Sequence, residues 1–304
     1  MLPSSTTRVR RTFALLLLAC SCTGTLSFFQ APTPHSTQHA TSSPPPLVPR
    51  LVRMDASPSS TATPTPIPSA VTTDNARGQH REACEDALSL YKRMRADDDP
   101  YMSTQLHTAL DVVEQALRLY GPSHVFASYN GGKDAVVVMH LLRVTLAHHV
   151  QAHELDEPSF SSSPSSLPPS IPRPRLVYFE QPSTEFPEVK SLVTQTTQRY
   201  DLDLRVYQDI PFAQGLKACI ESEGGAPLAF LLGTRKGDPN CKEQETFAPS
   251  STWMPAFMRV NPILNWTYGE IWHFLRRFDL PYCSLYDQGY TSLGKVDDTR
   301  PNPP

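Results

Sequence analysis

The sequence has few features of a disulfide-stapled, zinc-binding or membrane-spanning protein. Its six cysteines include no CxxC pair, and Cys84, Cys219, Cys241 and Cys283 are widely separated along the body of the chain. This spacing disfavours a zinc or disulfide framework and indicates reduced thiols. The apolar run Phe13–Ala19 is far shorter than the roughly 20 residues that cross a bilayer.

Acidic residues are absent from the first 54 positions, which carry five arginines. The whole chain has a formal net charge of −3, so the remainder is more acidic than that value suggests. An acidic body disfavours binding to nucleic acid or to an anionic membrane, and any recognition of phosphate must then be local. We expect small-molecule partners, and nothing in the sequence indicates an oligomeric state.

The first 76 residues resemble a targeting leader. A basic segment, Arg8–Arg11, precedes the short apolar run, so residues 1–27 have the form of a signal peptide. Residues 28–76 are rich in Ser, Thr and Pro and cannot fold a core, as in a transit peptide. This combination resembles the bipartite leaders of algae with secondary plastids, and we expect a plastid protein. The alternatives are a plain secretory signal and a true start at Met54, which would give a cytoplasmic protein.

Residues 77–304 show the alternating strand and helix patterns of an α/β domain. Helical composition or spacing marks residues 79–95 and 106–120, after which apolar strands alternate with helices. The strands are expected at 125–127, 176–179, 202–207 and 229–232, and the helices at 133–149, 187–200 and 213–221. This alternation predicts a doubly wound parallel sheet whose ligands lie beyond the carboxyl ends of the strands. Residues 154–174, rich in Ser and Pro, are interpreted as an inserted loop.

The turn after the first strand has the composition of a phosphate-binding loop. Two glycines allow a phosphate to approach the backbone, and the following helix directs unpaired N–H groups and its positive dipole end to the same point. Lys133 adds a charge, and Asp134 can cap the helix or help to hold Mg²⁺. The loop matches neither GxxxxGKS/T nor GxGxxG, which disfavours kinase-type and dinucleotide-binding loops. Its residues are Ser128, Tyr129, Asn130, Gly131, Gly132, Lys133 and Asp134.

This loop resembles the PP-loop of the ATP pyrophosphatases, and its Ser-Tyr-Asn-Gly-Gly-Lys-Asp form is similar to that of eukaryotic FAD synthases. The same resemblance extends to residues 126–303, apart from the inserted loop. It implies the PAPS reductase-like fold of the adenine nucleotide alpha hydrolases. The segments that carry it are Tyr178–Glu180, Glu185–Glu188, Leu232–Pro239, Phe257–Leu275 and Pro281–Gly294.

The resemblance implies that the chain joins FMN to the AMP of ATP and releases pyrophosphate, with Mg²⁺ as the expected metal. The catalytic residues that it carries over are Asn130, Lys133, Asp134 and Asp238, with Asp134 as the metal ligand. It assigns ATP and its phosphates to Ser128, Tyr129, Asn130, Gly131, Gly132, Lys133, Phe179 and Glu180. It assigns the flavin to Glu188, Gly233, Thr234, Arg235, Asp238 and Asn261. Backbone N–H groups of residues 130–133 and the Lys133 amine would hold the pyrophosphate.

Several residues also have a purely structural interpretation. Asp238 can cap its own turn, and Glu188 on a helix surface can be a solvated charge. Thr267 and Glu270 have the spacing of a helix-capping box. Histidines near the end of the helix predicted at 133–149 complement its dipole without a metal; they are His148, His149 and His153. Packing is favoured over flavin stacking for Trp266, Trp272 and Phe274.

Two other functions remain open. A PAPS reductase would need a nucleophilic Cys in an E-C-G-x-H segment, and nothing in this chain resembles that segment. A catalytically impaired paralogue that binds flavin or nucleotide is the second alternative. Members of the FAD synthase family continue past the Pro-Asn-Pro at residues 301–303 with an arginine motif that contributes to the active site, so we expect the C-terminus to be truncated.

The targeting hypothesis predicts that residues 1–75, fused to a fluorescent protein, direct it to the plastid of an alga with secondary plastids. Replacing Phe28 and Phe29 should stop the fusion before the organelle, because these aromatic residues lie near the expected cleavage point. Fluorescence microscopy of both fusions tests this. Cytosolic fluorescence from the intact leader would instead favour a start at Met54.

Overall fold

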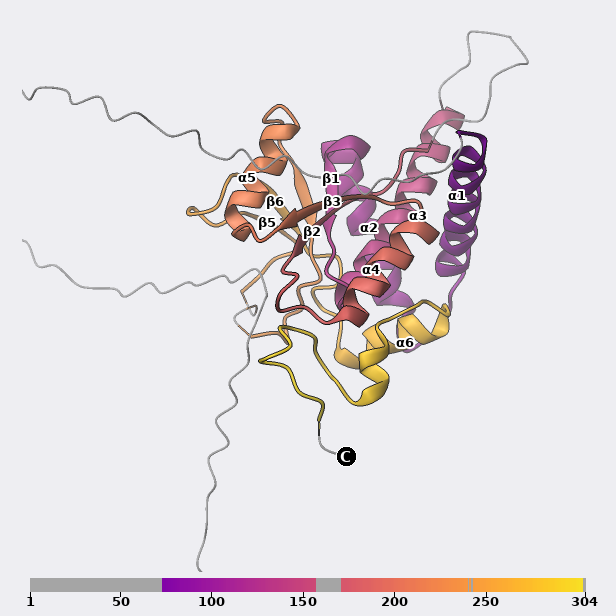
Figure 1. The fold of residues 1–304 in the computed structure, drawn as a ribbon. Coiled ribbons are helices and arrows are strands. Elements are labelled where there is room, and N and C mark those ends of the chain that lie inside the picture. Colours follow the sequence, from indigo (N-terminus) through magenta and orange to yellow (C-terminus); the bar gives the residue numbers. More distant parts are fainter. Residues whose placement is uncertain (1–72, 157–170, 240, 242, 303–304) are drawn as a thin grey trace, which may run out of the picture. The chain divides into compact units, whose positions relative to one another are not determined.

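The structure, a computed structural model, describes residues 73–156, 171–239, 241 and 243–302 (Figure 1). The predicted leader up to residue 72 and residues 157–170 of the predicted insert lie outside the described residues. No helix within the described ranges is both long and apolar enough to span a bilayer.

The fold is built on one six-stranded sheet. The strands lie in the order β3-β2-β1-β4-β6-β5, and every neighbouring pair is parallel except β5 with β6. The predicted doubly wound α/β class is confirmed, with one antiparallel edge strand added. The strand order reverses between β1 and β4, so the loops after these strands border the crevice where such sheets bind ligands. The strands are β1 (Val125–Ser128), β2 (Arg175–Glu180), β3 (Asp203–Gln208), β4 (Ala229–Leu231), β5 (Phe247–Pro249) and β6 (Met258–Val260).

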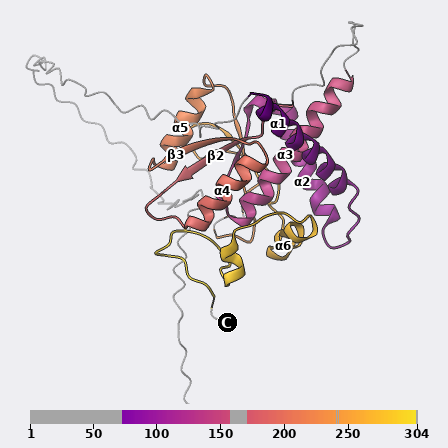
Figure 2. The same ribbon diagram turned by 45° about the vertical axis from the view of Figure 1, so that its right-hand side comes forward.

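Helices cover both faces of the sheet (Figures 1 and 2). One core joins α1, α2, α3, α4 and α6 to Val125 and Ala127 of β1, and the other joins α5 to Phe126 and Phe230. Alternate residues of β1 therefore face opposite cores, which explains why its first three residues are all apolar. The helices are α1 (Thr73–Arg95), α2 (Ser103–Tyr120), α3 (Lys133–Asp156), α4 (Pro187–Arg199), α5 (Phe212–Ser222) and α6 (Tyr268–Arg277).

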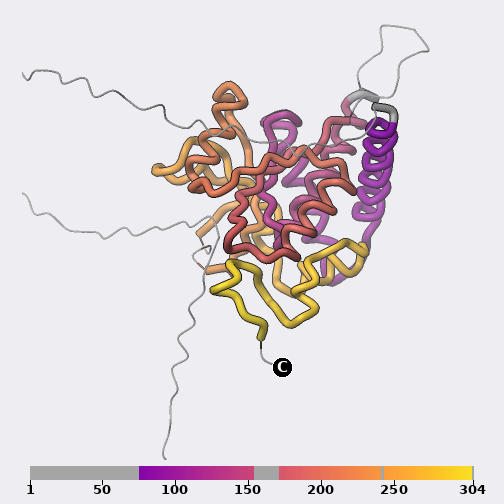
Figure 3. Tube along the Cα trace, in the orientation of Figure 1, coloured from indigo at the N-terminus to yellow at the C-terminus, as the bar shows by residue number. Residues whose placement is uncertain are grey.

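The chain after α6 returns along the loop edge of the sheet (Figure 3). It forms the short 3₁₀ helix η2 (Ser284–Gln288) and then an irregular segment. The N–H of Val296 in this segment donates to the carbonyl of Thr184, just after β2, at 2.9 Å. The C-terminal segment thereby comes close to the loops that follow the strands.

α3 is the central helix of the fold and is longer than predicted. Its residues 135–147 are all buried, as expected for a helix that is apolar around most of its circumference. It ends at Asp156 rather than at His149, so the interpretation of residues 154–156 as part of a loop is wrong. No helix-breaking Gly or Pro follows His149 before Pro158, and nothing stops the helix earlier.

The predicted capping box at the start of α6 is confirmed. Thr267 Oγ1 accepts from the N–H of Glu270 at 3.2 Å, and the Glu270 carboxylate accepts from the N–H of Thr267 at 2.5 Å. These two bonds satisfy N–H groups that the first turn of a helix leaves unpaired. Trp266 and Phe274 are buried in the core, whereas Trp272 is only partly buried against it.

A largely buried ion-pair cluster fastens the end of α5 to β2 and β3. Glu223, immediately after α5, accepts from both Nη atoms of Arg175 at 2.8 Å and pairs with Arg205 at 2.5 Å. Both guanidinium groups lie over the ring of Phe126, at 4.3 and 5.2 Å from its centroid. The hydrogen bonds from Arg175, followed by those from Arg205, lower the pKa of Glu223 from 4.5 to about 2. The folded chain therefore strongly favours the ionised carboxylate.

We expect Glu223→Gln to lower the free energy of unfolding by about 2 kcal/mol, because it removes charge-assisted hydrogen bonds from a largely buried site. Urea denaturation at neutral pH measures this difference. Glu221→Gln is the matched control, since the Glu221 side chain at the end of the same helix is 65% exposed. The control should change the free energy of unfolding by less than about 0.5 kcal/mol.

The effect of Glu223→Gln should also depend on pH. The folded pKa lies below the ordinary value of 4.5, so the contribution of Glu223 to stability is complete above that value. It is lost as the pH falls from 4.5 towards 2, because the unfolded chain then binds a proton that the folded chain does not. The difference in unfolding free energy between wild type and variant should shrink over that window. A difference that stays constant down to pH 3 would contradict the low pKa.

Candidate active site

A cavity of about 1220 Å³ opens at the carboxyl ends of the strands. The loops after β1, β2 and β4 contribute to its walls, at the edge where the sequence predicted ligands. The start of α5 and the segment around residues 291–302 complete the walls. The predicted site residues that line this cavity are Ser128, Tyr129, Asn130, Gly132, Lys133, Asp134, Phe179, Gly233, Thr234, Arg235 and Asp238.

The phosphate loop turns tightly between β1 and α3. Asn130 Oδ1 accepts from the N–H of Gly132 at 3.0 Å. Gly131 has a φ of +69°, and a Cβ there would lie 3.0 Å from a side chain of α4, so the turn requires glycine. The hydroxyl of Tyr286, in η2, accepts from the N–H of Lys133 at 2.9 Å. Two of the four N–H groups expected to hold pyrophosphate therefore already donate within the protein.

The Lys133 amine is held against two tyrosine rings. Its side chain is only 5% exposed, and Nζ donates to Asp134 Oδ2 at 3.0 Å. Nζ also lies 5.2 Å from the ring centroid of Tyr268 and 5.8 Å from that of Tyr286. The faces of aromatic rings attract an ammonium ion at such distances. The amine is thus a fixed positive charge beside the loop, largely shielded from water.

Arg235 links the phosphate loop to the turn after β4. Its Nε lies 2.9 Å from Asp134 Oδ1, and its Nη2 donates to Asp238 Oδ1 at 3.0 Å. The backbone N–H of Arg235 donates to Asp238 Oδ2 at 2.8 Å, so Asp238 closes its own turn, as the capping interpretation proposed. Burial raises the pKa of Asp238, although its bonds with Arg235 act in the opposite direction. Arg235, predicted for the flavin side, is therefore joined directly to the predicted metal ligand, and Asp238 is joined to it through Arg235.

Gly233 makes this junction possible. A Cβ at Gly233 would lie 3.1 Å from both the carbonyl carbon and the Cβ of Asp134. Backbone atoms at that distance cannot give way to a side chain without moving the start of α3. Glycine is needed here for the contact between the two loops.

Asp134 fits the expected Mg²⁺. Magnesium in proteins is commonly held by one or two carboxylates together with the phosphates of the substrate. Although Asp134 Oδ1 lies beside Arg235 Nε, the pair lacks hydrogen-bond geometry, and this buried oxygen has no hydrogen-bond partner in the described part of the chain. Its lone pairs remain available for a hard cation. The charge of Asp134 also contributes to the raised pKa of Asp238, so the two carboxylates belong to one electrostatic site.

Some predicted residues lie outside the cavity wall. Glu180 is buried and pairs with Lys190 Nζ and Gln208 Nε2, each at 2.5 Å. Asn261 is also buried, and its Nδ2 donates to the carbonyl of Glu245 at 2.7 Å. These side chains secure the strand ends that carry the loops. The four predicted residues away from the wall are Gly131, Glu180, Glu188 and Asn261.

Two aromatic residues border the cavity while being fixed by the core. The hydroxyl of Tyr129 forms a buried hydrogen bond with Thr196 Oγ1 at 2.8 Å. Phe179 stacks on Tyr207 and packs against Phe212, with centroids 5.5 and 4.6 Å apart. These rings shape the wall, and neither offers a polar group to a ligand.

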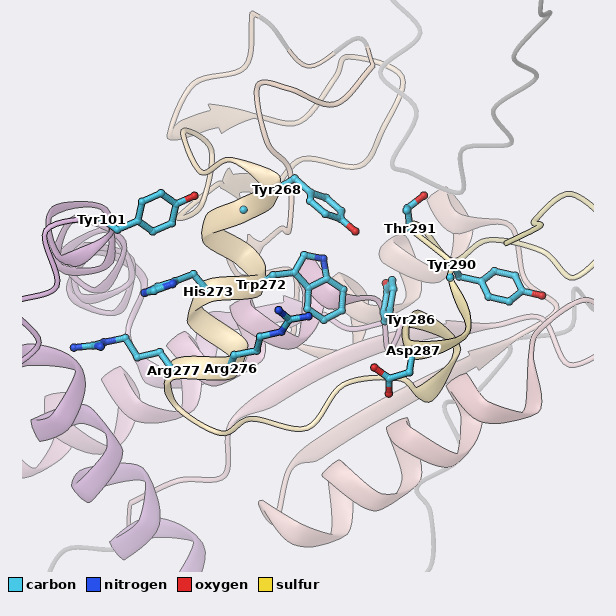
Figure 4. Close-up of a pocket in the computed structure, with 12 residues that line it drawn as sticks. Tyr101, Tyr268, Trp272, His273, Arg276, Arg277, Tyr286, Asp287, Tyr290 and Thr291 are labelled. Atoms are coloured by element: carbon cyan, nitrogen blue, oxygen red, sulfur yellow. The ribbon is translucent and has the colours of Figure 1, made fainter. Parts of the chain in front are cut away.

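A second pocket, of about 930 Å³, lies beside the first (Figure 4). Tyr268 and Tyr286 line both pockets, and Trp272 packs edge-on against Tyr286 with centroids 5.0 Å apart. None of the predicted site residues lines this second pocket. Both tyrosines lie in segments that resemble the FAD synthases, but the sequence alone indicated no role for them. Their contacts with Lys133 join parts of the chain more than 130 residues apart, which no local pattern shows.

Comparison with known proteins places this fold and site in a family. Residues 124–218 and 220–301 match the phosphoadenosine phosphosulfate reductase domain family. A protein of Schizosaccharomyces pombe named probable FAD synthase is 33% identical over 202 residues, which make up 66% of this chain and 70% of that protein. A Caenorhabditis elegans protein of the same name is 34% identical over 214 residues. That match covers 70% of this chain but only 37% of the longer nematode protein.

A solved structure shares the fold. The FMN adenylyltransferase of Candida glabrata, in complex with FAD and inorganic pyrophosphate, is 26% identical to this chain with a TM-score of 0.59. The match covers 74% of each chain. The resemblance found in the sequence motifs is thus confirmed over most of the described residues. The chain belongs to the phosphoadenosine phosphosulfate reductase domain family and, within it, to the FAD synthases.

Proposed function

We propose that this chain transfers the AMP of ATP to the phosphate of FMN. An oxygen of the FMN phosphate attacks the α-phosphorus of ATP, and the bond from that phosphorus to pyrophosphate breaks, so that FAD and pyrophosphate form. The observation that carries the proposal is the joined set Lys133, Asp134, Arg235 and Asp238, which lines one cavity in a chain of the FAD synthase family. The solved Candida glabrata relative is in complex with FAD and pyrophosphate, the two products of this reaction.

The protein's part in this reaction is positioning and neutralisation of charge, because the substrate itself supplies the nucleophile. The N-terminus of α3 directs its dipole at the cavity. Lys133 Nζ, now paired with Asp134, exchanges that carboxylate for the oxygens of the leaving pyrophosphate. The rings of Tyr268 and Tyr286 keep the amine in place during the exchange. Little reorganisation is then needed as charge develops on the leaving group.

Asp134 is the residue that would hold Mg²⁺, through the oxygen that lacks a hydrogen-bond partner. When bound, the metal ion supplies positive charge beside the phosphates. Asp134 thus links the cation to the same loop that receives the pyrophosphate.

Arg235 and Asp238 serve the flavin side. A guanidinium group can bind phosphate oxygens through a fork of N–H donors. Asp238, adjacent to it, can accept from the N–H group of the isoalloxazine ring. Because the two side chains are already bonded to one another, binding of FMN would replace or share these bonds.

Two of the described thiols, Cys219 and Cys283, are buried and are poor candidates for the nucleophile that the reductase alternative needs. Cys283 lies in a segment that the chain shares with FAD synthases, and its residue is only 1% exposed. Burial raises the pKa of the Cys283 thiol and likewise that of Cys219. A thiol must ionise and be reached by the substrate to act as a nucleophile. Neither of these cysteines meets that requirement.

We expect Lys133→Ala and Asp134→Ala each to lower kcat for FAD formation about a hundredfold, because each removes a charge contact at the transition state worth about 3 kcal/mol. FAD production from FMN, ATP and Mg²⁺ measures this, with Tm recorded for each variant to confirm folding. Lys236→Ala is the matched control, since the exposed Lys236 side chain lies next to Arg235 but does not line the cavity. Near-normal turnover by either test variant would refute the role of the loop.

We expect Asp238→Ala to weaken FMN binding more than ATP binding, because the isoalloxazine N–H group loses its acceptor. Titration of FMN fluorescence and a separate ATP titration measure the two dissociation constants. Asp238→Asn keeps one acceptor oxygen and should therefore have the smaller effect on FMN. A changed ATP constant with an unchanged FMN constant would show that the two sides of the site are reversed.

A further inference from the structure

A cluster of metal-ligating side chains lies between α2 and α3, outside the cavity. Glu114 of α2 meets His149 and His153 of α3, and one ligand atom from each lies within 4.8 Å of the other two. Within the described ranges this is the only group of three or more His, Cys, Asp or Glu side chains so arranged. His149 lies 16 residues after Lys133 along α3, so the cluster is roughly 24 Å from the phosphate loop.

The two histidines occupy one face of a helix. Their spacing of four residues puts the imidazoles one turn apart, as in helical zinc sites. The ring centroids of His149 and His153 are 4.3 Å apart. His153 is exposed and the His149 side chain is 8% exposed, so the pair reaches from the helix interface to the solvent. Ions can enter from the His153 side.

Glu114 supplies the third group from the neighbouring helix. Its Oε1 lies 2.9 Å from His149 Nδ1. Ligand atoms around a tetrahedral zinc ion, each about 2.0 Å from the metal, are about 3.3 Å from one another. The carboxylate and the imidazole are therefore already near the separation that a shared ion imposes. The α2–α3 packing that brings them together belongs to the main core of the fold.

A second observation points to a missing partner. Glu114 Oε2 is buried and has no hydrogen-bond partner in the described part of the chain. A buried carboxylate oxygen without a partner is costly, and native structures rarely leave one unpaired without a reason. A cation shared with the two imidazoles would satisfy it.

We propose that Glu114, His149 and His153 bind a divalent transition-metal ion, represented by Zn²⁺, that links α2 to α3. Two imidazoles and one carboxylate suit zinc, whereas magnesium and calcium prefer sets of oxygen ligands. A water molecule would complete a four-coordinate ion. The site is separate from the phosphate loop, so it stabilises the packing of the two helices without entering the adenylyl transfer.

Positively charged side chains near the cluster would compete with an entering metal ion for the Glu114 carboxylate. Arg118 Nε donates to Glu114 Oε1 at 3.0 Å, but the Arg118 side chain is 65% exposed and can turn into solvent. Arg95 and His148 also lie close enough for charge interaction around this cluster. Arg118 holds the carboxylate in the absence of metal, and its removal should strengthen metal binding.

The test is a calorimetric titration of the full-length, tag-free chain with ZnCl₂ in buffer containing Mg²⁺. We expect one Zn²⁺ per chain, and we expect His153→Gln to weaken its binding roughly tenfold or more, because loss of a group that only orients a ligand already costs that much. His148→Gln is the matched control, since His148 stacks on Tyr91 instead of joining the cluster. At the same Zn²⁺ concentration, the ion should raise the Tm of wild type and of the control more than that of His153→Gln.

Two further measurements test two alternatives. In one, the metal ion binds to cysteine thiolates elsewhere in the chain; in the other, Glu114 only forms hydrogen bonds and ion pairs with its neighbours. Arg118→Gln should bind Zn²⁺ more tightly than wild type, which a purely structural role for Glu114 would not produce. The Co²⁺-loaded chain should show visible absorption without the sulfur-to-metal charge-transfer band that thiolate ligands give. Unchanged Zn²⁺ affinity in His153→Gln, or a thiolate band in the Co²⁺ spectrum, would overturn the proposal. FAD formation should be the same in wild type and His153→Gln.

Discussion

The candidate active site depends on one electrostatic constraint: the carboxylate of Asp134 is mostly buried and must keep positive charge beside it. A carboxylate that is largely removed from water is costly unless a positive charge pairs with it. Lys133 and Arg235 supply that charge, at 3.0 and 2.9 Å from its two oxygens. Because Asp134 opens α3 and Arg235 follows β4, this carboxylate fixes the relative position of the two loops at the switch point of the sheet. Gly233 permits their close approach.

The same constraint explains how so polar a site persists without its substrates. Its central charges neutralise one another, from Lys133 through Asp134 and Arg235 to Asp238. Under the proposed function, an entering phosphate would not have to order free side chains, since it would take over contacts that the protein already makes. One N–H group of the loop is occupied by the Tyr286 hydroxyl, so a ligand that needs this donor must displace it. Under the proposed function, binding would exchange partners within a pre-arranged network, an arrangement that favours catalysis of phosphoryl chemistry.

Local sequence patterns predicted most of the strands, helices and loops that surround this site. The features that were not predicted depend on contacts between residues far apart in the sequence. The alternation of apolar strands and helices placed the loops, and the Thr267–Glu270 spacing identified a helix start that the structure confirms. β5 and β6 were not predicted, because their sequences, Phe-Ala-Pro and Met-Arg-Val, lack the continuous apolar run that marks β4, and their pairing depends on partners elsewhere. The roles of Tyr268 and Tyr286 beside Lys133 were missed for a similar reason. Glu180 and Asn261, assigned through the family resemblance, bond to neighbouring strands and loops, and their roles toward ligands stay predictions.

α3 runs from the phosphate loop at its N-terminus to the proposed metal site near its C-terminus. Its N-terminus forms the phosphate loop, its middle is buried on all sides, and its last turns carry His149 and His153. Because close-packed cores deform little, the two ends of a helix packed in this way keep a fixed relative position. The sequence showed the histidines but not the carboxylate that gives them a possible ligand set, since Glu114 lies 35 residues upstream of His149 on another helix. Tightening the far end of α3 against α2 would stabilise the packing of the two helices while leaving the chemistry at the other end to Lys133 and its partners.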